Sequence, residues 1–185
     1  MGTMRHGIDI DQLVGTVKAI QENPDLARFR FRAVTEWVAG GHSRTKIQGF
    51  YGAGAEDASR DSPFVLEGDE PPVLLGTNVG PNAVETVLSA LASCLTVGIV
   101  YNAAARDLPI ESLSFTLEGD IDLQGFLGLS EQVRPGYRNI RLSCRVRSDA
   151  PREKLEELWE YVRRTSPVLD IVRNPVPVSL TIDRT

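Results

Sequence analysis

The chain has 185 residues, of which 42% are hydrophobic and 24% charged, the composition of one large domain able to bury a sizeable core. Its formal net charge of -5 and isoelectric point near 5.1 argue against nucleic acid and anionic membranes as partners, because phosphate groups repel an acidic surface. Two cysteines are too few for a disulfide framework and suit a reducing cytoplasm.

The first part of the chain predicts a helix followed by a β hairpin. Apolar residues recur at helical spacing over residues 10–20, and residues 23–24, Asn-Pro, end that helix. Acidic residues near the amino terminus argue against a secretory signal, so we expect a cytoplasmic protein. Apolar and charged residues alternate over residues 29–37, which is typical of a strand with one covered face. Two glycines at 40–41 turn the chain, and residues 42–50 can return as the partner strand.

Residues 51–80 are rich in Gly, Pro, Asp and Ser, with short apolar pieces at 63–66 and 73–75, and we expect a long ordered loop that holds one or two short strands. An uncharged segment follows at residues 86–105. It is long enough to cross a bilayer, but its alanines and polar residues make it weakly hydrophobic on a transfer scale. We therefore favour a central helix that its own protein covers on all sides.

The central helix has a recognisable start. The Asn82 side chain can cap its first free amides, and Glu85 can reach back to the amide of Asn82 to complete a capping box. This spacing predicts a helix that begins at residue 83 and ends near residues 107–109.

The second part of the chain predicts two strands and two helices. The strands, at residues 113–121 and 140–147, have acidic and arginine-rich outer faces that suit one another if the strands are antiparallel neighbours. A helix follows over residues 151–165, then a short helix at 167–172 and a last strand at 176–182. The order of elements indicates an α+β fold in which antiparallel sheets pack on helices.

Cys94 is the residue best placed to carry chemistry. It lies within the uncharged segment, twelve residues after Asn82, beyond the first turn in which a helix dipole favours an anion. Burial among apolar groups opposes ionisation of a thiol, so activation needs a cation from another element or subunit. Arg44 is a candidate for that cation. The alternative is that Cys94 packs as a small apolar side chain.

Six short segments carry a resemblance to a known family. In order, they are GPN at 80–82, ETVLSALASCLT at 85–96, EGDIDL at 118–123, GFLG at 125–128, SPV at 166–168 and NPVPV at 174–178. They resemble the OsmC/Ohr family, the osmotically inducible and organic hydroperoxide resistance proteins of bacteria. The resemblance covers residues 37–182 and implies a single domain that forms an intertwined homodimer, with antiparallel sheets packed around two central helices.

The same resemblance implies an activity and a set of residues. The better-known members of the family reduce organic hydroperoxides with a reactive cysteine, a resolving cysteine, an assisting arginine and glutamate, and a dithiol reductant such as a lipoylated protein. Cys94 matches the reactive cysteine, but the resolving position holds Ser166. The glutamate position holds Val84, next to Glu85, and a histidine follows the Gly-Gly turn, with Arg44 two places on. We expect neither a cofactor nor a metal site.

Within the resemblance we divide the domain into residues 1–27, an N-terminal helical extension, residues 28–80, a hairpin and loop, and residues 81–185, the helices and C-terminal sheet. The candidate catalytic residues are Cys94, Arg44, Ser166 and Glu85.

Three of the singled-out residues also have structural explanations. Ser166 suits the cap of the short helix, and Glu85 suits the capping box. Cys144 lies on the apolar face of its strand, which favours a core residue over a substitute resolving cysteine. Two functions therefore remain open: reduction of hydroperoxides through Cys94 with an external thiol, or a non-catalytic dimer that binds a small hydrophobic ligand at the subunit interface. A dimeric interaction scaffold is a third possibility.

Overall fold

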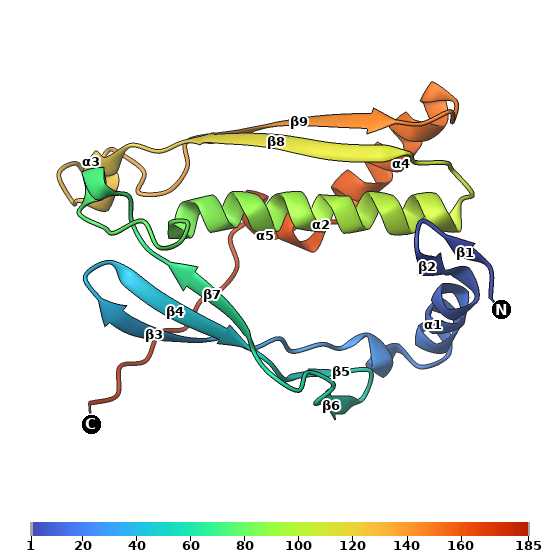
Figure 1. The fold of residues 1–185 in the computed structure, drawn as a ribbon, viewed down its shortest axis with the longest axis horizontal. Helices are drawn as coiled ribbons and strands as arrows, with labels where there is room; N and C mark the ends of the chain where they lie inside the picture. Colours follow the sequence, from blue (N-terminus) through green and yellow to red (C-terminus); the bar gives the residue numbers. More distant parts are fainter. Residues whose placement is uncertain (1, 185) are drawn as a thin grey trace. The chain divides into compact units, whose positions relative to one another are not determined.

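The computed structural model describes residues 2–184, which form two compact units, one ending at Val87 and the other beginning at Leu88. The elements of the first unit, shown in Figure 1, are β1 (Met4–Arg5), β2 (Ile8–Asp9), α1 (Ile10–Glu22), η1 (Pro24–Ala27), β3 (Val34–Ala39), β4 (His42–Ile47), β5 (Phe50–Gly52), β6 (Ala55–Asp57), β7 (Phe64–Gly68) and η2 (Pro72–Leu74). Helix α2 (Ala83–Ala105) begins in the first unit and continues through the second. The second unit then contains β8 (Ser112–Asp120), α3 (Leu123–Phe126), β9 (Asn139–Arg147), α4 (Arg152–Thr165) and α5 (Pro167–Arg173).

A three-stranded antiparallel sheet, in the order β3-β4-β7, is the main sheet of the first unit. The predicted hairpin is confirmed, and Gly40 at its turn has a φ of 57°, which favours glycine. The predicted first strand is confirmed only from Val34 onward. In the preceding stretch Phe29 stacks on Phe50 and the Phe31 ring lies tilted against it. Strand pairing there is limited, among the described residues, to an isolated bridge between Arg30 and Tyr51.

The long loop before α2 is partly as predicted. The strand expected at residues 63–66 is confirmed as β7, which pairs with β4. The other apolar piece, at 73–75, is not a strand, because η2 occupies most of that segment. Pro72 is fixed at a helical φ at the start of this turn, and Leu75 ends it in the left-handed region, with a φ of 67°. The short β5–β6 hairpin was not predicted.

The two predicted helix starts in this unit are capped by side chains. Asp9 accepts a hydrogen bond of 3.0 Å from the amide of Gln12, and α1 ends at Glu22, before the predicted Asn-Pro stop. At α2 the amide of Asn82 donates to the Glu85 carboxylate and the amide of Glu85 donates to the Asn82 side chain, both at 2.9 Å. The predicted capping box is therefore confirmed.

The second unit contains the hydrophobic core. Buried side chains of α2 and α4 form a cluster consisting of Leu91, Leu95, Ile99, Ala103, Leu158 and Val162. The apolar face of the β8–β9 sheet packs against this cluster, and Figure 1 shows both strands running along α2. The strands are antiparallel neighbours with Glu118 opposite Arg141, so the predicted match between acidic and basic outer faces is confirmed.

The prediction that α2 is covered on all sides is wrong for the described residues. One side of the helix is buried in the core, whereas Val97 and Tyr101 on another side are 55% and 46% exposed. Among the described residues α2 is also the one helix whose length and composition would allow it to span a membrane. The apolar surface of α2 thus exceeds what the described chain covers.

The predicted last strand at residues 176–182 is absent from the described chain. This segment is extended but pairs with no strand, and its side chains Val178 and Leu180 are 74% and 90% exposed. A strand forms only beside another strand, and Pro175 and Pro177 each lack an amide hydrogen to donate. The segment therefore has the alternating pattern of a strand, but the described chain supplies no neighbouring strand to pair with it.

Candidate active site

The Cys94 thiol and the Ser166 hydroxyl meet in the second unit. Cys94 lies on α2 and Ser166 lies between α4 and α5, and their Sγ and Oγ atoms are 3.2 Å apart. The residues one turn away explain this placement. A Cβ atom at Gly98 would come within 2.8 Å of a methyl group of Val162, so the glycine allows α4 to lie close against α2. Ser166 follows Val162 by four residues, as Gly98 follows Cys94, which brings the two polar side chains together.

Ser166 is a buried side chain with two hydrogen-bond partners. Only 6% of the residue is exposed. Its Oγ accepts a hydrogen bond of 3.3 Å from the amide of Leu169, which makes it the N-cap of α5 as predicted. Because that amide is a donor, the hydrogen of the Ser166 hydroxyl can point at Cys94 Sγ. The geometry therefore provides a hydrogen-bond donor to a thiolate at Cys94.

A pocket of about 400 Å³ opens beside these two residues. Its lining in the described chain consists of Ser93, Cys94, Val97, Gly98, Asn102, Val162, Thr165, Ser166 and Pro167. Apart from the Cys94 thiol, none of these side chains is ionisable. Such a lining favours neutral molecules with an apolar body, and it supplies hydroxyl and amide groups but no cation.

Arg44 lies in the first unit, where it forms a charged cluster with two neighbours. On the paired strands β4 and β7, Arg44 Nε donates to Glu67 Oε1 and His42 Nε2 lies beside Glu67 Oε2, both at 2.7 Å. His42 and then Arg44 lower the pKa of the Glu67 carboxyl below its usual 4.5. Among the described residues, the terminal amino groups of Arg44 have no hydrogen-bond partner.

Sequence reasoning missed Glu67. The signal was a charge directly across from Arg44, but that pairing depends on the register of β7 against β4. The sequence between these two strands is a long loop, and its pattern does not show where β7 begins. The pairing of Glu67 with Arg44 could therefore not be predicted from the sequence.

Glu85 and Cys144 both have the structural settings considered above. Glu85 is engaged in the capping box at the start of α2. Cys144 lies opposite Phe115 on β9, packs against the core, and lines a different pocket from that of Cys94. Burial raises the pKa of the Cys144 thiol, which disfavours its thiolate and slows its reactions without preventing them. Both cysteines are free of disulfide bonds.

Comparison with known proteins shows the family of this chain. The model of the family described as OsmC-like protein matches residues 76–181, a range that includes Cys94 and Ser166. The chain belongs to the OsmC-like family. No protein among those with curated descriptions matches it.

Solved structures of OsmC-like proteins share the fold. An OsmC-like protein from Mycoplasma pneumoniae has 16% identity and a TM-score of 0.60, over 79% of this chain and 89% of that one. The organic hydroperoxide resistance protein OsmC from Legionella pneumophila has 17% identity and a TM-score of 0.53, over 77% and 88%. An OsmC-like protein from Vibrio cholerae has 11% identity and a TM-score of 0.53, over 76% and 92%. These similarities confirm the predicted α+β, OsmC-like fold.

Proposed function

We propose that this OsmC-like protein reduces organic hydroperoxides, with Cys94 as the nucleophile and an external thiol as the reductant. The observation that carries the proposal is the contact between Cys94 Sγ and Ser166 Oγ at the wall of a pocket suited to neutral molecules. The Legionella pneumophila relative is named an organic hydroperoxide resistance protein, and that name is in keeping with the reduction of organic hydroperoxides proposed here.

The reaction begins with attack of the Cys94 thiolate on the outer oxygen of a hydroperoxide. The O–O bond breaks and the terminal OH group passes to the sulfur, which becomes a sulfenic acid. The alkoxide takes up from water the proton that Cys94 released on ionising, and it leaves as an alcohol. A first external thiol then displaces water from the sulfenic acid and forms a mixed disulfide with Cys94. A second thiol breaks that disulfide and restores Cys94. The balance is one hydroperoxide and two thiols converted to one alcohol, one water and one disulfide.

Ser166 determines how this cycle proceeds. A serine cannot form a disulfide, so the Cys94 sulfenic acid persists until a thiol from outside the protein reaches it. The Ser166 hydroxyl instead donates a hydrogen bond to the thiolate in the resting state. Hydrogen bonds to an ionised group are about twice as strong as those between neutral groups, and here the bond is largely shielded from water.

The remaining requirement is a cation for the thiolate, and we propose Arg44 for that role. Its Nε is held by Glu67, which leaves the terminal amino groups for another anion. We further propose a homodimer, in which Arg44 of either subunit completes the site. Support for the dimer comes from the exposed apolar side of α2 and from the unpaired C-terminal segment.

A turnover assay with an organic hydroperoxide and a dithiol reductant tests the activity. The wild type should consume hydroperoxide catalytically, Cys94→Ser should not, and the matched control Cys144→Ser should keep the activity. Ser166→Cys should form an internal disulfide after oxidation and depend less on the concentration of external thiol. Unchanged turnover in Cys94→Ser would exclude the proposed mechanism. Saturable binding of the hydroperoxide without turnover would favour a non-catalytic ligand-binding role.

A further inference from the structure

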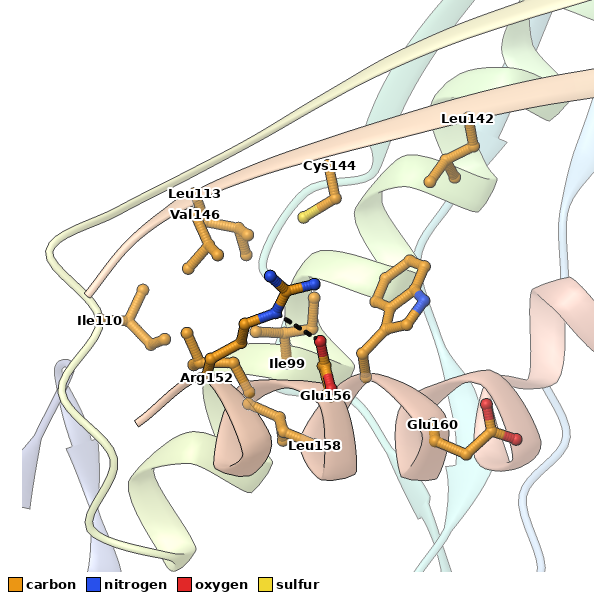
Figure 2. A pocket seen from close by; sticks show the side chains of 12 residues that line it. Ile99, Ile110, Leu113, Leu142, Cys144, Val146, Arg152, Glu156, Leu158 and Glu160 are labelled. Carbon is orange, nitrogen blue, oxygen red and sulfur yellow. Dashed lines mark hydrogen bonds and ion pairs between the residues drawn. The ribbon is translucent and has the colours of Figure 1, made fainter. Parts of the chain in front are cut away.

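A second and larger groove lies in the second unit, between α4 and the β8–β9 sheet (Figure 2). Its volume is about 820 Å³, within the range of small-molecule sites. The groove is mainly apolar and is lined, among others, by Ile99, Leu113, Leu142, Val146 and Leu158. Neither Cys94 nor Ser166 lines it, so this groove is distinct from the proposed active site.

Arg152, at the rim of this groove, contributes little to the stability of α4. It is the first residue of α4, where the helix dipole disfavours a cation. Its ion pair with Glu156 has the basic residue on the N-terminal side, the less favourable order along a helix. The Arg152 side chain is also 90% exposed, so the pair contributes little to folding.

The orientation of Arg152 points to a ligand. Its Nε donates to Glu156 Oε1 at 2.7 Å, but its two terminal amino groups have no partner among the described residues. Figure 2 shows the terminal amino groups on the side of the groove where Cys144 lies, while the side chain itself stays open to solvent at the rim. A guanidinium with its terminal edge free matches the two oxygens of a carboxylate.

The other charges at the groove do not oppose an anion at this position. Arg152 is the one cation among the described lining residues. Of the two lining carboxylates, Glu156 is paired with the Nε of Arg152. Glu160 is paired with Arg163 of the same helix at 2.9 Å. The free positive edge of Arg152 thus faces an apolar surface rather than an uncompensated carboxylate.

We propose that this groove binds a small amphipathic carboxylate of the medium-chain fatty acid class. The apolar chain lies against the side chains of α2, β8 and β9, and the carboxylate binds the terminal amino groups of Arg152. Because Cys144 and Trp159 both line the groove, a bound chain alters the surroundings of a thiol and of an indole.

Titration with decanoate tests this site. In a Trp37→Phe background, Trp159 is the remaining tryptophan, and its fluorescence should change saturably with decanoate. Arg152→Gln should weaken decanoate binding about tenfold, because a charged hydrogen-bonded pair is lost. The matched control Arg164→Gln, on the same helix but outside the groove and unpaired with its carboxylates, should keep the wild-type affinity. The wild type should bind decanol more weakly than decanoate. Arg152→Gln should bind the two compounds with equal affinity.

Protection of Cys144 locates the bound molecule. In a Cys94→Ser background, decanoate should slow alkylation of Cys144 by a neutral maleimide, with half-protection at the concentration that half-saturates the fluorescence change. Unchanged alkylation would place the binding elsewhere and overturn the proposal. Absence of saturable binding would also overturn the proposal. So would a loss of affinity in Arg164→Gln equal to that in Arg152→Gln, or equal affinities of the wild type for decanol and decanoate.

Discussion

At the scale of single residues, Ser166 links folding to the proposed chemistry. One oxygen atom caps α5 through the amide of Leu169 and also contacts Cys94 Sγ. The cap could be predicted from the Ser-Pro pair, because both residue types have fixed positional preferences at helix starts. The contact with the thiol could not, since it depends on how closely α4 approaches α2.

Ser166→Ala should separate these two roles. Loss of the cap should reduce the free energy of unfolding by about 1 kcal/mol. Loss of the hydrogen bond to the thiolate should slow the reaction of Cys94 with hydroperoxide by about tenfold. Rapid-mixing kinetics and denaturant unfolding measure the two effects. A control cap variant, Asp9→Ala at α1, should lose similar stability without slowing Cys94. If Ser166→Ala reacts as fast as the wild type, Ser166 is a cap alone.

At the scale of elements, the close approach of α2 and α4 positions the site. Gly98 carries no side chain where Val162 approaches, and this contact lies one turn from the Cys94–Ser166 pair. A glycine in the interior of a helix costs about 1 kcal/mol relative to alanine, which the packing here must offset. The sequence shows a glycine within this helix, but it does not show that Val162 approaches Gly98 too closely for a larger side chain.

Gly98→Ala should therefore be destabilising in spite of its higher helix propensity. The added methyl group forces Val162 to move, and overpacking of this kind costs about 1–3 kcal/mol. The shift should also weaken the contact between Ser166 and Cys94 and slow peroxide reduction. The matched control Gly15→Ala should be neutral or stabilising, because in α1 the new methyl group meets no atom within 4 Å beyond the neighbouring residues and backbone of its own helix. Equal stability gains in both variants would contradict this account of α2 and α4.

The charged cluster on β4 and β7 predicts a dependence on pH. Since His42 and Arg44 lower the pKa of Glu67, its ionised form stabilises the folded state above pH 4.5, and this contribution is lost as pH falls through the lowered pKa. Glu67→Gln removes the contribution. The difference in unfolding free energy between wild type and Glu67→Gln should be present above pH 4.5 and shrink as the pH falls through the lowered pKa of Glu67.

Trp37 fluorescence in a Trp159→Phe background reports unfolding of the first unit, where the cluster lies, and so measures this difference. A difference that stays constant down to the acidic end of the range would show that the ion pairs do not stabilise the sheet.

At the scale of the whole molecule, the buried hydrophobic residues of the described chain all belong to the second unit, from Leu91 to Val162. The three-stranded sheet of the first unit has exposed apolar side chains, including Trp37 and Phe64 at 76% and 61%. Alternating hydrophobicity predicted β8 and β9 over nearly their whole length, because the pattern within each of these strands does not depend on its partner. The apolar patterns of residues 176–182 and of α2 led to wrong predictions, because the described chain does not supply the surface that would cover these apolar residues.

Truncation after Asn174 tests whether a second copy supplies that surface. We predict a dimer for the full chain in sedimentation experiments. The truncated chain should dissociate or unfold at a lower temperature, because the apolar residues Val176, Val178, Leu180 and Ile182 lose their partner. A variant with Val178 and Leu180 both replaced by serine keeps the chain length and should behave like the truncated chain. A monomeric full chain as stable as the truncated one would contradict the proposed dimer.

Trapping of the sulfenic acid tests the proposed chemistry most directly. The wild type is treated with one equivalent of an organic hydroperoxide in the presence of a sulfenic-acid-specific reagent, and the modified peptide is identified by mass spectrometry. We predict one adduct, on Cys94, and none in Cys94→Ser. Absence of an adduct from Cys94, or modification of Cys144 at the same rate, would contradict the account.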